Sequence, residues 1–134
     1  MNLIANKPVA IVAETQPKTE IVWGISRYDE RQQVKDDKVL LRDFIREEFD
    51  KIGADGKVMA AVCEAESGLD RYAVSKTEDV GLCQIHLYNG YRMGLGKEEL
   101  YDPATNITAA LAIYQSQGTN AWTTYRNKRY LDFL

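Results

Sequence analysis

The feature that most constrains the fold is a set of three segments with apolar residues at three- and four-residue spacing. Each segment lies between a capping aspartate and a terminating glycine. We expect helices over residues 36–53, 55–68 and 102–118, the last with Pro103 at its first helical position. Each helix can bury only one face, so the helices must pack against one another or against the chain between them. The sequence therefore predicts a mostly α-helical domain.

The long stretch between the second and third expected helices, residues 69–101, has no helical period and is rich in glycine, asparagine, serine and tyrosine. A short extended segment is expected at its centre, over residues 81–85. We expect this irregular insertion to form a substrate cleft. Its tyrosines either stack on a ligand or pack the loop onto the helices, and packing is the commoner use of such side chains. They are Tyr88, Tyr91 and Tyr101.

Residues 1–35 show no sustained period and are expected to be an extension or linker, which leaves residues 36–134 as one domain. The N-terminus lacks the basic start and unbroken apolar core of a secretion signal. No apolar run approaches the length of a membrane span. With a net charge of −3, the chain has no basic stripe of the kind that nucleic-acid binders use. We expect a monomer that needs no nucleic acid and no cofactor.

The chain has two cysteines, Cys63 and Cys83. They could form a disulfide, which would suit an exported protein, or remain two buried thiols. A metal site that adds His86 is a further alternative. Structural zinc generally needs four protein ligands, however, and these three are the only cysteine and histidine residues of the chain. We therefore expect no metal site.

Glu66 is the residue whose position points to chemistry. It stands one turn beyond Val62 and Cys63, on the stripe expected to face the core, just before Gly68 ends the helix. A carboxylate there must be neutral, paired or at the edge of a cleft, because burying an unpaired charge is costly. Burial raises the pKa of a carboxyl group, so Glu66 could protonate a glycosidic oxygen. The alternative is a structural role at the helix end. Glu64 falls on the other face and is expected in solvent.

Four motifs follow one another in a recognisable order. They read Ala-Glu-Ser-Gly-Leu at 65–69, Ala-Val-Ser at 73–75, Gly-Leu-Cys-Gln-Ile at 81–85, and Asp-Pro with Asn-Ile at 102–107. Together they resemble the transglycosylase domain of soluble lytic transglycosylases and goose-type lysozymes, in the lysozyme-like superfamily. The resemblance covers about residues 40–134 and implies an α-rich lysozyme-like fold. The closing segment, residues 122–127, departs from the family's usual Ala-Tyr-Asn-Ala-Gly pattern.

The resemblance implies cleavage of the β-1,4 bond between N-acetylmuramic acid and N-acetylglucosamine in peptidoglycan glycan strands. Glu66 would be the single acid and base, and Tyr125 would be a catalytic residue close to it. Ser67 would support the acid from the adjacent position, and Asn106 would fasten the third helix under the groove. Substrate binding would fall to a set of residues along the groove: Ser67, Ser75, Gln84, His86 and Tyr114.

The product and the setting remain open. In the lytic transglycosylases that the chain resembles, the muramic acid 6-hydroxyl attacks C1 and leaves a 1,6-anhydro sugar. A hydrolase instead needs water, usually held by a second carboxylate, for which Asp79 and then Glu78 are candidates, although both could be exposed loop charges. A non-catalytic glycan-binding or structural module is the alternative of a different class. The site of action would be the cell wall, periplasmic or extracellular, for a bacterial or a phage protein.

Overall fold

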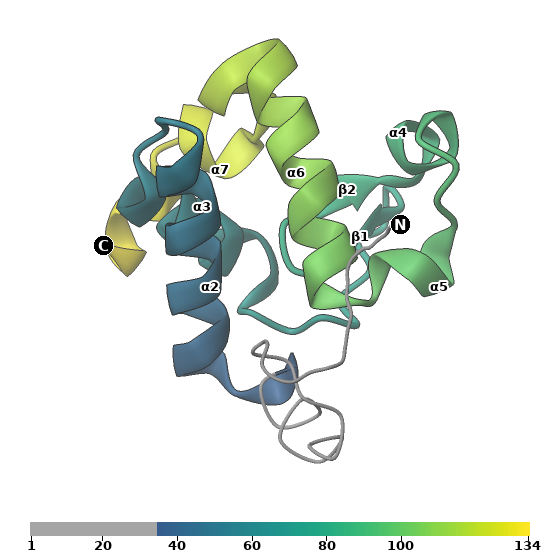
Figure 1. The fold of residues 1–134 in the computed structure, drawn as a ribbon, viewed down its shortest axis with the longest axis horizontal. Helices are drawn as coiled ribbons and strands as arrows, with labels where there is room; N and C mark the ends of the chain where they lie inside the picture. Colours follow the sequence, from purple (N-terminus) through teal and green to yellow (C-terminus); the bar gives the residue numbers. More distant parts are fainter. Residues whose placement is uncertain (1–34) are drawn as a thin grey trace, which may run out of the picture. The chain divides into compact units, whose positions relative to one another are not determined.

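The structure, a computed structural model, describes residues 35–134. Almost all of the expected extension lies outside the described residues, so the boundary near residue 35 stays a prediction. The described part is mostly helical, as predicted, and one small hairpin interrupts the helices (Figure 1). None of the helices in residues 35–134 combines the length and the apolar character needed to cross a bilayer.

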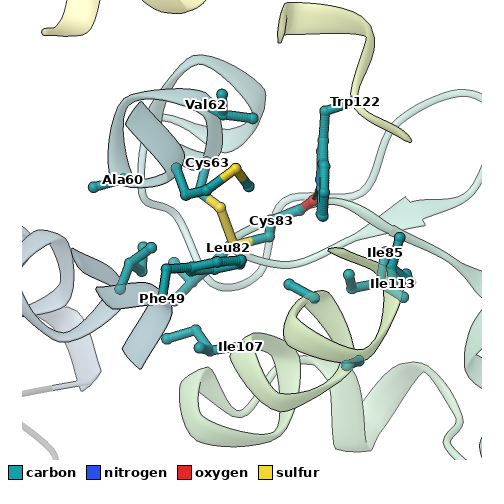
Figure 2. Close-up of a cluster of buried hydrophobic side chains, with 14 of the residues drawn as sticks. Phe49, Ala60, Val62, Cys63, Leu82, Cys83, Ile85, Ile107, Ile113 and Trp122 are labelled. Carbon is teal, nitrogen blue, oxygen red and sulfur yellow. Dashed lines mark hydrogen bonds between the residues drawn. A yellow bond between two sulfur atoms is a disulfide. The ribbon is translucent and has the colours of Figure 1, made fainter. Parts of the chain in front are cut away.

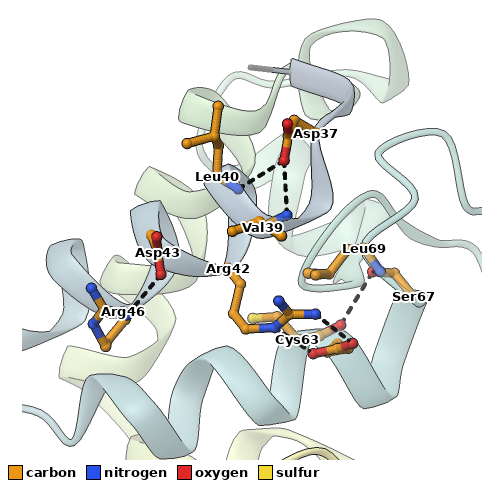
Figure 3. Close-up of polar contacts among 10 residues, drawn as sticks. Asp37, Val39, Leu40, Arg42, Asp43, Arg46, Cys63, Ser67 and Leu69 are labelled. Carbon is orange, nitrogen blue, oxygen red and sulfur yellow. Dashed lines mark hydrogen bonds and ion pairs between the residues drawn. The ribbon is translucent and has the colours of Figure 1, made fainter. Parts of the chain in front are cut away.

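The first long helix, α2, spans Lys38–Lys51. Its cap is Asp37, whose carboxylate accepts hydrogen bonds from the backbone N–H groups of Val39 at 3.0 Å and Leu40 at 3.1 Å (Figure 3). Its buried apolar face consists of Leu41, Ile45 and Phe49. The expected helix is confirmed, with Asp37 as its capping aspartate.

The second helix, α3, spans Gly56–Ser67, and most of its residues are buried. The carboxylate of Asp55 accepts a hydrogen bond from the Val58 N–H at 3.2 Å, and the chain leaves the helix at Gly68 with φ of 65°. This left-handed conformation is one that glycine adopts without steric cost. Because α3 packs against α2, α7 and η2, segments from both ends of the domain contact it.

The third long helix, α6, spans Pro103–Gln117, with Asp102 as its cap. The C-terminal segment then forms short turns of helix that return to α3: η1 over Gly118–Ala121, α7 over Thr123–Arg126 and η2 over Arg129–Phe133. All three predicted helices are therefore present with their predicted caps.

The insertion is more regular than predicted. It contains the antiparallel strands β1, Asp79–Val80, and β2, Ile85–His86, followed by α4, Leu87–Arg92, and α5, Lys97–Leu100. The expectation of an extended segment over residues 81–85 is wrong except at its last residue. The backbone turns between the strands because Gly81, at φ of 81°, and Gln84, at φ of 53°, both take left-handed conformations.

Buried apolar side chains from α2, α3, α6 and the insertion form one core (Figure 2). A disulfide between Cys63 and Cys83 joins α3 to the turn between the strands (Figure 2). The two cysteines therefore form a disulfide and are not free thiols, which the sequence alone left open. This bond also removes the alternative of a metal site with His86, because neither sulfur is free to bind a metal as a thiolate. Within residues 35–134, no three histidine, cysteine, aspartate or glutamate side chains are grouped so that they could hold a metal ion.

Candidate active site

The last turn of α3 places Glu66 in the wall of a small polar cavity of about 130 Å³. The insertion supplies one wall, and α6 with the segment after it supplies the other. The lining residues are Glu66, Asp79, Gln84, Ile85, His86, Asn89, Ile113, Gln117, Ala121, Trp122 and Thr123.

Thr124 is the residue that holds the Glu66 carboxyl group. Its hydroxyl donates a hydrogen bond to Oε2 at 2.8 Å, and its backbone N–H donates to the same oxygen at 3.4 Å. Burial raises the pKa of Glu66 above its usual value, while the two hydrogen bonds from Thr124 oppose that rise. The charge of Asp79 raises the pKa further, and that of Arg129 lowers it. The net result is a raised pKa, which favours the protonated acid.

Glu64 has quite different surroundings on the same helix. Its two carboxylate oxygens accept hydrogen bonds from Nε and Nη2 of Arg42, both at 2.9 Å, so that α3 is tied to α2. The expectation that Glu64 is simply solvated is wrong. Its side chain is 19% exposed because the bidentate pair lies between the two helices.

The turn between the strands is held against the end of α3 by side chains. The Ser67 hydroxyl lies 2.6 Å from the carbonyl oxygen of Leu82. It also lies 3.1 Å from the carbonyl oxygen of Cys63 and accepts a hydrogen bond from the Leu69 N–H (Figure 3). Ser67 therefore supports the acid through the backbone and is not among the residues that line the cavity. Gln84 does line it.

The amide nitrogen of Gln84 donates to the carbonyl oxygens of Ala73 at 3.1 Å and Gly81 at 3.0 Å. These contacts fix the side chain at the edge of the cavity. The same turn is fastened from the far side by Trp122, whose indole N–H donates to the Cys83 carbonyl oxygen at 2.8 Å (Figure 2). The segment opposite Glu66 is thus anchored at several points.

Asp79 lines the same cavity as Glu66. Its Oδ2 accepts hydrogen bonds from the hydroxyls of Ser75 at 2.8 Å and Thr77 at 2.6 Å. The Ser75 hydroxyl also accepts from the Asp79 N–H at 3.0 Å. Ser75 is absent from the cavity lining and contacts the site through Asp79. The second carboxylate that the sequence offered is therefore close to the acid and held in place.

His86 lies on the cavity wall at the start of α4. Its Nδ1 accepts a hydrogen bond from the Tyr88 N–H at 3.1 Å, which places the proton of a neutral ring on Nε2. One helical turn further, Asn89 lines the same wall. The sequence predicted no helix after His86, and for that reason the contribution of Asn89 was missed.

Two of the proposed site tyrosines pack against other aromatic rings. Tyr125 stacks on Tyr130 at 5.0 Å between ring centroids, and Tyr114 meets Phe49 edge to face at 5.6 Å. Neither is among the residues that line the cavity. The closing segment does reach Glu66, but through Thr124, the residue before Tyr125. The sequence places both residues in the right segment, and only the turn of α7 shows which one faces the acid.

The tyrosines of the insertion differ among themselves. Tyr101 packs edge to face on Tyr72 at 5.2 Å, whereas Tyr88 and Tyr91 are 62% and 63% exposed. None of the three lines the cavity. The packing interpretation therefore holds for Tyr101 alone.

Comparison with known proteins gives one match. The family model described as the transglycosylase SLT domain matches residues 43–127, more than half of the chain, and this range includes every residue that lines the cavity. No curated protein and no solved structure matched. Together with the α-rich fold, the match shows that this chain belongs to the transglycosylase SLT domain family of the lysozyme-like superfamily.

Proposed function

We propose that the protein cleaves the β-1,4 bond between N-acetylmuramic acid and N-acetylglucosamine in peptidoglycan, with Glu66 as general acid and then base. Family membership supports a glycan strand of the cell wall as the substrate. The observation that carries the proposal is the half-buried Glu66 carboxyl group, whose pKa is raised by burial where it faces the cavity. A carboxyl group with a raised pKa keeps its proton to higher pH than an ordinary one, and it can donate that proton to a leaving oxygen.

The contacts of Glu66 suggest which oxygen carries the proton. Oε2 accepts both hydrogen bonds from Thr124, so the acid proton is best accommodated on Oε1. In the proposed reaction this proton moves to the glycosidic oxygen while the C1–O bond breaks and its electron pair goes to that oxygen. Positive charge then develops at C1. The resulting Glu66 carboxylate accepts the proton of the nucleophile that attacks C1.

The muramic acid 6-hydroxyl is the proposed nucleophile, which makes the reaction a lytic transglycosylation with a 1,6-anhydro product. The family's description supports this choice. Hydrolysis is a second candidate because Asp79 lines the cavity and its Oδ2 is held by two hydroxyls. Mass spectrometry of the digest separates the two, since anhydro ends mean transglycosylation and reducing ends mean hydrolysis. Asp79→Asn should abolish reducing-end products, whereas anhydro products should persist.

The main test is the release of soluble fragments from purified cell walls by wild type and by Glu66→Gln. Loss of a general acid typically costs about 10²- to 10⁴-fold in rate, and we expect a loss in that range. Glu64→Gln is the matched control, since it makes the same change two residues away in the Arg42 pair. Equal activity of Glu66→Gln and wild type would contradict the assignment. Saccharide binding without any cleavage by wild type would favour a non-catalytic glycan-binding module.

The cell wall, outside the cytoplasm, is the proposed site of action. The disulfide between Cys63 and Cys83 supports this, because disulfides persist in oxidising compartments and are rare where thiols are kept reduced.

A further inference from the structure

The disulfide between Cys63 and Cys83 joins the two segments that carry Glu66 and Gln84 (Figure 2). Cys63 precedes Glu66 by three residues in α3, so the two stand about one helical turn apart. Cys83 is the residue before Gln84 in the turn between the strands. Glu66 and Gln84 both line the cavity. The covalent link therefore fixes two parts of the cavity wall relative to each other.

The surroundings of the disulfide leave little room for movement. Both cysteines are 0% exposed and belong to the apolar core. The backbone of Cys83 is held from two sides, because its N–H donates to Oδ1 of Asn106 at 2.9 Å and its carbonyl oxygen accepts from the Trp122 indole at 2.8 Å. Protein cores are packed about as densely as organic crystals. A change in the space that the two sulfurs need must therefore move α3, the turn or both.

Reduction of the disulfide would make such a change. The Cα atoms of Cys63 and Cys83 lie 4.4 Å apart, a separation that a disulfide permits. Two thiols are not bonded to each other, and non-bonded atoms keep a wider separation than bonded ones. The reduced pair therefore needs more room, which α3 and the turn can provide only by moving apart. A displacement of about 1 Å in an active site can lower the rate on the order of a hundredfold.

We propose that the disulfide is a redox switch of the candidate active site. With Cys63 and Cys83 bonded, Glu66 and Gln84 are held in the positions that catalysis needs. With both cysteines as thiols, the protein is folded but its activity is much lower. The inference rests on the proposed function, which assigns the cleavage to Glu66. Because disulfides persist only in oxidising compartments, the enzyme becomes fully active only outside the reducing cytoplasm.

The switch operates by thiol–disulfide exchange. On oxidation, the thiolate of one cysteine attacks a disulfide oxidant such as oxidised glutathione and displaces one of its two sulfurs as a thiolate. The second cysteine then attacks the mixed disulfide, forms the bond between Cys63 and Cys83, and releases the other sulfur. The protein loses two electrons and two protons, and the oxidant becomes two thiols. Since both sulfurs are buried, the exchange requires an opened chain, and the redox state is set while the chain folds.

The test measures the release of soluble fragments from purified cell walls by the full chain in two forms. One form is oxidised, and the other is refolded and kept in dithiothreitol as the dithiol. Circular dichroism checks that each form is folded at the assay temperature. We expect kcat of the folded dithiol form to be about 10- to 100-fold lower.

The double variant Cys63→Ala with Cys83→Ala is the matched control, because it leaves the chain without a cysteine. Dithiothreitol should not change its rate. Its rate should also exceed that of the dithiol form, since two alanines need less room than two thiols. A variant as slow as the dithiol form would show that crowding by the thiols is not the cause, and it would overturn the inference.

A binding measurement separates this inference from the proposed function. If oxidised wild type cleaves cell walls, equal rates of the two folded forms would overturn the inference and leave the proposed function intact. Activity lost only together with the fold would overturn it as well. If oxidised wild type cleaves nothing, the proposed function fails, and both forms of Glu66→Gln are titrated with the N-acetylglucosamine tetramer. Weaker binding to the folded dithiol form then supports the inference, and equal binding overturns it.

Discussion

Two glutamates of α3 stand two residues apart and meet opposite surroundings. Glu64 is neutralised by a bidentate contact with Arg42, whereas Glu66 faces the cavity with Thr124 as its hydrogen-bond donor. The pKa of Glu66 is raised because desolvation outweighs the hydrogen bonds that stabilise its anion. A residue held in this way destabilises the folded protein whenever it is ionised, and that cost can be measured.

Replacing Glu66 by glutamine should stabilise the protein, and only at higher pH. As pH rises from the usual value of 4.5 through the raised pKa, the unfolded chain releases this proton before the folded protein does. The folded state then holds more protons, so the free energy of unfolding falls with rising pH. Glu66→Gln removes this loss and should match wild type below pH 4.5. Urea unfolding at a series of pH values measures it. A stability difference independent of pH would contradict the buried acid.

Thr124 should control both the position and the acidity of Glu66. Thr124→Val keeps the shape of the side chain but removes the hydroxyl that donates to Oε2. Because this hydrogen bond lowers the pKa of Glu66, its loss should raise that pKa and move the alkaline limb of the pH–rate profile to higher pH. The misplaced acid should also lower kcat, by about tenfold. Thr124→Ser restores the hydroxyl and should restore both. An unchanged profile in Thr124→Val would show that Thr124 only packs.

At the scale of elements, the buried amide of Asn106 joins α6 to the insertion. Its oxygen accepts from the Cys83 N–H at 2.9 Å, and its nitrogen donates to the carbonyl oxygens of Val80 at 2.8 Å and Leu100 at 2.9 Å. A side chain at Gly81 would collide with this amide, so glycine is required there by space as well as by its φ. One residue of α6 thus fastens the turn that carries Gln84.

Asn106→Ala should destabilise the fold on the order of 3 kcal/mol, because it leaves buried backbone groups without partners. It should also lower activity, since the turn opposite Glu66 loses its anchor. The control is Thr108→Ala, on the exposed side of the same helix, which should stay within about 0.5 kcal/mol of wild type. Chemical unfolding followed by circular dichroism measures both. Similar stabilities for the two variants would show that Asn106 is not the anchor.

At the scale of the whole molecule, the described domain is closed around α3. The disulfide joins this helix to residues 20 positions further along the chain, and α7 returns from the C-terminal end to contact its last turn. The indole N–H of Trp122 also donates a hydrogen bond to the Cys83 carbonyl oxygen, which ties the C-terminal segment to the turn between the strands. The cavity therefore depends on three distant parts of the chain meeting at one place.

Removing the disulfide should lower the free energy of unfolding by about 3 kcal/mol. The disulfide restricts the unfolded chain, so without it the loop between the cysteines loses more conformational freedom on folding. The double variant Cys63→Ser with Cys83→Ser tests this by thermal unfolding. Wild type with reductant should unfold at the same temperature as the variant without it. Identical unfolding of oxidised wild type and the variant would contradict a stabilising disulfide.

The sequence by itself determined the three helices, the caps of the second and third, and the position of Glu66 on the core-facing side of α3. Caps and helical periodicity act over a few residues, so they can be read from neighbours along the chain. The motifs around Glu66 and Gln84 likewise placed the chain in its family.

Only the tertiary structure decided which groups meet Glu66. The contact with Thr124 joins residues 58 positions apart, and the Arg42–Glu64 pair joins residues 22 apart. The sequence pointed to Tyr125 because it identifies the segment but not the face that a short helix turns inward. The hairpin turn at Gly81 and Gln84 was missed for a related reason, since non-glycine residues rarely take the conformation that Gln84 adopts. Contacts of this range depend on how the elements pack, which no local pattern records.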